Sequence, residues 1–99
     1  MDTGKSDNDI LKKIKDHIRN GTYILREHAI KRQEHRQVRL PDVLRVLEHG
    51  RHESEKDIFD VKNQRWKYAI NGRTVNGTNL RVIVAFHEKM AIITVIRIN

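Results

Sequence analysis

Two apolar runs near the C-terminus, residues 80–87 and 90–98, limit the fold of this chain more than any other feature. Both are rich in β-branched side chains, contain no Gly or Pro, and have about the length of one strand, which favours β structure. Because only Glu88 and Lys89 separate them, we expect two adjacent antiparallel strands. Apolar residues occupy odd and even positions alike, so other parts of the chain should cover both faces of this pair.

A third strand is predicted over residues 64–70, with Trp66 and Tyr68 on one face and Lys67 on the other. A two-residue turn between the two apolar runs would also fix their pairing, because side chains alternate between the faces of a sheet. In that register one face carries Arg81, Ile83, Ala85 and His87, opposite Ile96, Thr94, Ile92 and Met90.

The segments before these strands include two amphipathic helices. The first covers residues 7–20 and either packs on the sheet or offers a docking face to another chain; we favour packing on the sheet. The second begins near Pro41, which suits a first helical turn, and ends before Gly50. The apolar stripes are Ile10, Leu11, Ile14 and Ile18 in the first helix, and Val43, Leu44, Val46 and Leu47 in the second.

Two shorter segments have a weaker β pattern. Residues 22–25 are β-prone and form either an edge strand or a connector. Residues 51–62 are acidic and mixed, and we interpret them as a strand at the sheet edge, where Asp57 and Asp60 would discourage further pairing.

Together these elements predict an α+β fold in which an antiparallel sheet of three to five strands packs with N-terminal helices. A chain of 99 residues suits one core, so we assign residues 7–99 to a single domain and residues 1–6 to a flexible N-terminus. The N-terminus lacks the apolar region of a signal peptide, and no apolar segment is long enough to span a bilayer. We therefore expect a cytoplasmic protein that does not contact the membrane.

The charge of +7 is unevenly distributed along the chain. Residues 1–41 hold ten Lys or Arg and six Asp or Glu, residues 42–60 hold three and six, and residues 61–99 hold seven and one. The positive field therefore belongs to the sheet strands and the first helices, which is the distribution that binding to a phosphate backbone requires. The simpler explanation is a basic, soluble surface without a partner.

A polar stretch over residues 26–36 is compatible with a helix that has almost no apolar stripe. In such a helix His28, Arg32, His35 and Arg36 fall on one side, at spacings of four, three and one residues. This side is either a phosphate-binding ridge or a solvated face whose charge is relieved by neighbouring glutamates.

The order of elements resembles that of the RelE-like small toxin domains. More locally, the sequence is similar to an uncharacterised bacterial domain family often grouped with them, over residues 23–98. The shared features are His28-Ala29-x-x-Arg32, Arg36, Asp42-Val43, Gly50, Gly72 and Ile93-Thr94-Val95. The resemblance implies a metal-independent ribonuclease without a small-molecule cofactor, often partnered by an antitoxin protein.

The residue types present also suit this chemistry. RNA is cleaved when its 2′-hydroxyl attacks the adjacent phosphate, and a protein then needs to supply a base, an acid and positive charge. His28 is the first candidate for proton transfer and His87 the second, while Arg32 and Arg36 are candidates for holding the phosphate. Further RNA contacts are expected from Lys67, Arg73, Arg81, Arg97, Trp66 and Tyr68.

A metal site is not predicted, because Gly50 ends the helix between His49 and His52 and no third ligand can be assigned. The leading hypothesis is an RNA-binding, toxin-like domain with endoribonuclease activity as its further expectation. The alternative is a non-catalytic module that binds nucleic acid or a protein.

Overall fold

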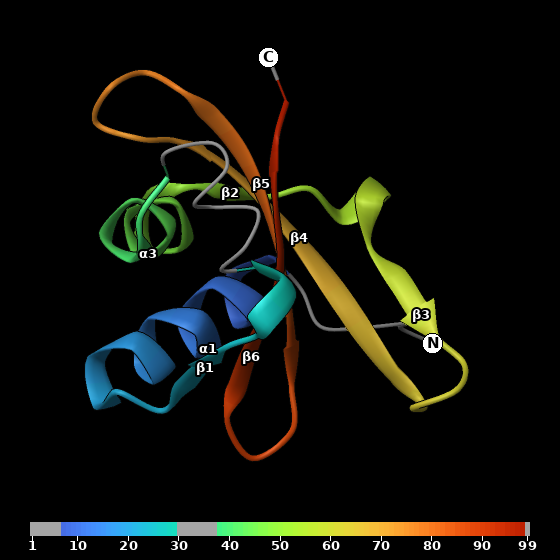
Figure 1. The fold of residues 1–99 in the computed structure, drawn as a ribbon. Helices are drawn as coiled ribbons and strands as arrows, with labels where there is room; N and C mark the ends of the chain where they lie inside the picture. Colours follow the sequence, from blue (N-terminus) through green and yellow to red (C-terminus); the bar gives the residue numbers. More distant parts are fainter. Residues whose placement is uncertain (1–6, 30–37, 99) are drawn as a thin grey trace.

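The computed structural model describes residues 7–29 and 38–98, and in these ranges the chain has an α+β fold, as predicted (Figure 1). Five strands are ordered β1-β6-β5-β4-β2, and β3 pairs with a further part of β4. The predicted flexible N-terminus, residues 1–6, lies outside the described residues.

The three long strands form the centre of the sheet. They are β4 (Arg65–Arg73), β5 (Asn79–Phe86) and β6 (Met90–Arg97), paired antiparallel in chain order. Their central position follows from their composition, because β-branched side chains cover both faces of β5 and β6.

The predicted pairing of β5 with β6 is correct at one end of the strands and wrong at the other. Arg81 pairs with Ile96 and Ile83 with Thr94, as expected. An irregularity after Ile83 then shifts the register, so that Ala85 pairs with Ala91 and His87 lies in the connecting turn. The physical reason is an extra residue in β6, Ile93, which is accommodated as a bulge and also permits a longer turn.

The edges of the sheet agree with the prediction only in part: of the two alternatives for residues 22–25, the edge strand is correct. At one edge β1 (Tyr23–Leu25) pairs parallel to β6, so the sheet is mixed and not wholly antiparallel. At the other edge β2 (Arg51–His52) and β3 (Ile58–Asp60) both pair antiparallel with β4. The 3₁₀ turn η1 (Ser54–Lys56) separates them, so the single predicted edge strand is two short ones.

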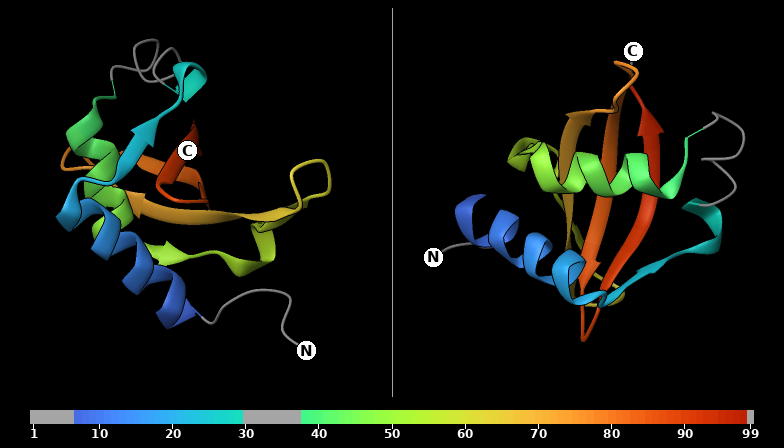
Figure 2. Two further views of the ribbon diagram at one scale, coloured as in Figure 1. Left: turned by 90° about the horizontal axis from the view of Figure 1, so that it is seen from below. Right: turned by 90° about the vertical axis from the view of Figure 1, so that its left-hand side faces the viewer.

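Two helices cover one face of the sheet, α1 (Asp7–Asn20) and α3 (Leu40–His49) (Figure 2). The prediction that the first helix packs on the sheet is confirmed, since Ile10 and Ile14 are fully buried. The core joins these helices to the sheet through Val43, Leu47, Ile70, Leu80, Val82, Val84, Met90 and Ile92. Neither helix is long and apolar enough to cross a membrane, and the same holds for any helix of the described ranges.

Candidate functional site

The face of the sheet opposite the two helices carries a groove of about 590 Å³. One wall is the hairpin formed by β3 and β4, which projects from the body of the sheet (Figure 1). On the opposite side the groove ends at β1 and Arg26, and the turn between β5 and β6 closes one end. The lining residues are Ile24, Arg26, Asp60, Asn63, Arg65, Lys67, Ala85, His87, Glu88, Lys89, Ala91 and Ile93.

The floor of the groove consists of apolar side chains, two of which are small. Ile24, Ala91 and Ala85 form a row across β1, β6 and β5, because Ala91 pairs with both of the others. Ile93, the bulge residue of β6, extends this row. The two alanine side chains leave room above the sheet, so the floor accepts a flat or apolar group.

Four cationic side chains and one imidazole line the groove. Arg26 follows β1, where its backbone N–H donates to the carbonyl of Ile92 at 3.0 Å. His87 and Lys89 belong to the turn between β5 and β6, closed by a hydrogen bond of 3.1 Å from the His87 N–H to the Lys89 carbonyl. Arg65 and Lys67 are two residues apart on β4, so they point to the same face.

Asp60 is the carboxylate of the hairpin wall. It accepts hydrogen bonds from the side chain of Asn63 at 2.8 Å and from its backbone N–H at 3.2 Å. Its Oδ2 also lies 3.6 Å from the Lys67 Nζ. The hydrogen bond from the Asn63 side chain contributes most to lowering the pKa of Asp60, with a smaller contribution from Lys67. Asp60 therefore shapes the hairpin and partly offsets the charge of Lys67.

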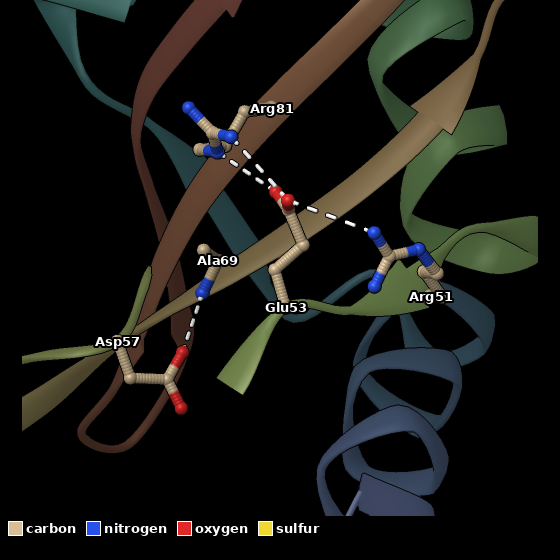
Figure 3. Close-up of polar contacts among 5 residues, drawn as sticks. All are labelled: Arg51, Glu53, Asp57, Ala69 and Arg81. Atoms are coloured by element: carbon tan, nitrogen blue, oxygen red, sulfur yellow. Dashed lines mark hydrogen bonds and ion pairs between the residues drawn. The ribbon is translucent and has the colours of Figure 1, made fainter. Parts of the chain in front are cut away.

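A second polar cluster connects the end of β2 with β5, across β4 (Figure 3). Glu53 is 4% exposed, and its carboxylate accepts hydrogen bonds from Arg81 Nε at 2.7 Å and Nη2 at 3.3 Å. Arg51 lies 3.8 Å from the same carboxylate. The hydrogen bond from Arg81 lowers the pKa of Glu53 against the opposing effect of burial.

Asp57 joins β2 and β3 to the sheet through its side chain. Its Oδ1 accepts the backbone N–H of Ala69 at 2.9 Å, where η1 interrupts the strand pairing, and its Oδ2 lies 2.7 Å from His52 Nε2. The Asp57 carboxylate is therefore used for contacts within the protein. It does not have the predicted role of discouraging a further strand from pairing.

The predicted catalytic residues are only partly brought together. His87 lines the groove, whereas the exposed side chain of His28 lies two residues beyond Arg26 and does not. Arg32 and Arg36 lie outside the described residues, so the predicted ridge of His28, Arg32, His35 and Arg36 stays a prediction.

The four predicted RNA-binding cations occupy three different places. Lys67 lines the groove, and Arg81 is held by Glu53. Arg73 and Arg97 are exposed, and they pair with the first two residues of β5, at the end of that strand remote from the groove.

The two predicted aromatic contacts lie on the helix side of the sheet. Tyr68 is 8% exposed, and its burial raises its pKa. Trp66 packs against the core and meets the Phe59 ring edge to face, with centroids 5.5 Å apart. The predicted alternation of these aromatics with Lys67 is therefore confirmed, and it points them away from the groove.

Three groove cations were not among the predicted site residues: Arg26, Arg65 and Lys89. Arg65 had a signal, because it precedes Lys67 by two residues on a predicted strand and must share its face. Arg26 had none, because its position depends on the parallel pairing of β1 with β6.

Within residues 7–29 and 38–98, no group of three His, Asp or Glu side chains is placed to bind a metal ion. His49 is exposed at the end of α3, and His52 is buried against Asp57.

The model of one protein domain family matches the sequence over residues 25–97, from the last residue of β1 to the last residue of β6. No curated protein and no solved structure matches the chain significantly. The matched range includes α3 and the strands from β2 to β6, but only the last residue of β1. The chain therefore belongs to the family described as a domain of unknown function, DUF4258.

Proposed function

We propose that the protein binds RNA in the groove between β1 and the hairpin of β3 and β4. The observation that carries this proposal is the placement of Arg26, Arg65, Lys67 and Lys89 around one apolar floor. Phosphate oxygens are satisfied by Arg and Lys donors, and the floor suits a sugar or the face of a base. The resemblance of the sequence to RelE-like toxin domains is the expectation from which this proposal starts.

Electrostatics also favours an anionic partner over a neutral one. Asp60 and Glu88 are the two carboxylates in the lining, and Asp60 is engaged with Asn63 and Lys67. The net field of the groove is therefore positive, in agreement with the overall charge of +7. Binding to phosphates would release counterions, so the affinity should fall steeply with salt.

The finer proposal is cleavage of the bound RNA without a metal ion. The 2′-oxygen attacks the adjacent phosphorus and the bond to the 5′-oxygen breaks, which leaves a 2′,3′-cyclic phosphate and a 5′-hydroxyl. One group accepts the proton of the 2′-hydroxyl and another donates a proton to the 5′-oxygen. We assign one transfer to His87, in the groove, and retain His28 as the candidate for the other.

The alternative is a non-catalytic module that binds nucleic acid or a protein such as an antitoxin. It is favoured by one observation, that His87 is the single imidazole among the described residues lining the groove. One imidazole cannot act as base and acid in the same step.

Incubating the purified protein with a fluorescent oligoribonucleotide and EDTA tests whether it cleaves RNA or only binds it. Cleavage predicts a cyclic phosphate product, and a 2′-deoxy nucleotide at the cut site should abolish it. His87→Ala should then lower the rate at least a hundredfold, because general acid or base catalysis typically contributes 10²–10⁴-fold. Arg97→Gln, which removes a cation remote from the groove, is the control.

Binding without cleavage would establish the non-catalytic module. If the wild-type protein neither binds nor cleaves RNA at low salt, the proposed function is wrong.

A further inference from the structure

Strand β3 combines two features that soluble proteins usually keep apart. It lies at an edge of the sheet, where β4 is the one strand of the described residues that pairs with it. It also exposes large apolar side chains, Ile58 at 63% and Phe59 at 40%, and Val61 directly after the strand is 70% exposed. Edge strands are normally protected by charge, proline or a covering segment, because their free backbone groups can pair with another chain.

The apolar side chains lie on both faces of this edge. Ile58 pairs with Lys67 and therefore points to the groove side, while Phe59 pairs with Trp66 on the helix side. A strand added beside β3 would place its alternate side chains against each of them. The backbone groups would supply affinity, and the exposed side chains would supply selectivity.

Two lysines flank the strand, Lys56 before it and Lys62 after it. Both are exposed, and neither forms an ion pair within residues 7–29 and 38–98. The nearby carboxylates are engaged, since Asp57 contacts His52 and Asp60 contacts Lys67. The charge of Glu55 also acts on Arg81, whose pKa it helps to raise. The two ends of the exposed edge are therefore positive.

A second copy of this chain fits the edge poorly. In the symmetric antiparallel pairing that uses all of Ile58–Asp60, Phe59 faces its own copy and Ile58 faces Asp60. The same register brings Lys56 of each copy opposite Lys62 of the other, which places like charges together.

We infer that β3 is a docking edge for an extended segment of another protein, apolar in its centre and acidic at both ends. The segment adds a strand beside Ile58–Asp60, and its acidic ends contact Lys56 and Lys62. This edge is the outer side of the groove wall that β3 and β4 form, where β3 does not pair with β4, and the inference does not depend on the proposed function.

Trp66 is the only tryptophan of the chain and lies behind Phe59, so its fluorescence reports on the occupancy of β3. The probe is a capped peptide of seven residues, Glu-Thr-Val-Val-Ile-Thr-Glu. It should change the tryptophan emission and shift the amide NMR signals of Ile58–Asp60. Replacing both glutamates by lysines should weaken binding roughly tenfold, since two exposed ion pairs become two repulsive ones. Methylating the alternate backbone nitrogens that would face β3 should abolish binding.

Protein variants separate docking from nonspecific adhesion. Ile58→Thr with Val61→Thr should weaken binding at least fivefold, whereas Val75→Thr, at a site 75% exposed in the hairpin between β4 and β5, should not. Lys56→Glu with Lys62→Glu should exchange the preference between the acidic and the basic peptide. Absence of binding at millimolar peptide, binding that survives backbone methylation, or a concentration-dependent dimer that buries Trp66 would overturn the inference.

Discussion

At the scale of single residues, the Glu53 carboxylate shows how burial turns a surface residue type into a structural one. It is nearly inaccessible to water and is tolerated mainly because Arg81 donates two hydrogen bonds to it. The guanidinium in turn is fixed in one orientation on the open face of the sheet. Arg81 is thus the least available for RNA of the predicted binding cations whose positions the structure describes.

Replacing Arg81 by Met should destabilise the protein by about 2–3 kcal/mol at pH 7. The loss is below the usual 3–5 kcal/mol for a broken buried pair, because the Arg81 side chain keeps 21% exposure. The pKa of Glu53 is lowered in the folded protein, so the pair contributes its full stability above the ordinary pKa of 4.5. That contribution disappears as the pH falls through the lowered pKa.

Urea unfolding at a series of pH values measures this effect. The difference between wild type and Arg81→Met should shrink steadily below pH 4.5, where protonated Glu53 no longer needs a cation. Arg73→Met, an exposed site on β4, should change stability by less than about 0.5 kcal/mol at every pH. A constant difference between pH 7 and pH 3.5 would refute the assignment.

The sequence allowed the face of Lys67 to be predicted, but not the pairing of Arg81. Alternation along a strand is a local property, so Lys67, Trp66 and Tyr68 could be assigned to faces from their spacing alone. The partner of Arg81 is 28 residues away, on a segment whose contact with the sheet depends on the 3₁₀ turn before β3. Long-range pairs of this kind follow from topology.

At the scale of elements, the contact between the end of α3 and β4 explains two of the glycines. An added Cβ at Gly50 would lie 2.5 Å from the carbonyl oxygens of Asn71 and Val46, both of which belong to the backbone. At Gly72 the nearest atoms would be Gly50 Cα and Val46 Cγ1, each at 3.2 Å. The absence of a side chain at Gly50 thus lets the helix end directly on the strand.

Gly50→Ala should therefore cost about 3 kcal/mol, since backbone atoms of two elements must move apart. Gly72→Ala should cost only about 1 kcal/mol, because its nearest contacts are at 3.2 Å, so Gly50 and Val46 need to shift by only a few tenths of an ångström. Denaturant unfolding orders the two variants. The control is Gly21→Asn, where no atom lies within 4 Å and Asn tolerates the positive φ of 70°. A larger loss for Gly72 than for Gly50 would contradict this account.

The long elements were predictable in type, whereas the short ones were predicted only as alternatives or with wrong bounds, for a physical reason. Periodicity over 8–14 residues predicts β5, β6 and α1, because many side chains repeat the same pattern. In β2, with two residues, and β1, with three, no pattern can repeat, and both depend on pairing with a longer strand. The bulge at Ile93 had no local signal either, and it moved His87 from the predicted strand into the turn.

At the scale of the whole molecule, the two faces of the sheet have different tasks. The face covered by α1 and α3 (Figure 2) carries the core, while the other face carries the groove and the Glu53 cluster. Positive charge occurs on both sides, because Lys12, Lys15 and Arg19 are exposed on α1. Net charge alone therefore cannot explain where an anion would bind.

This separation predicts that equal losses of charge on the two sides have unequal effects on RNA binding. Changing Arg26, Arg65 and Lys89 to Gln removes three charges from the groove, and changing Lys12, Lys15 and Arg19 to Gln removes three from α1.

Each phosphate contact contributes about 0.7 to the slope of log affinity against log salt for a single strand. The groove variant should therefore lose about 2 from that slope and bind much more weakly at low salt. The α1 variant should keep the wild-type slope, since its charges act only over a screened distance. Fluorescence anisotropy with one oligoribonucleotide at several salt concentrations compares them, and equal slopes for the two variants would mean that the groove is not the binding site.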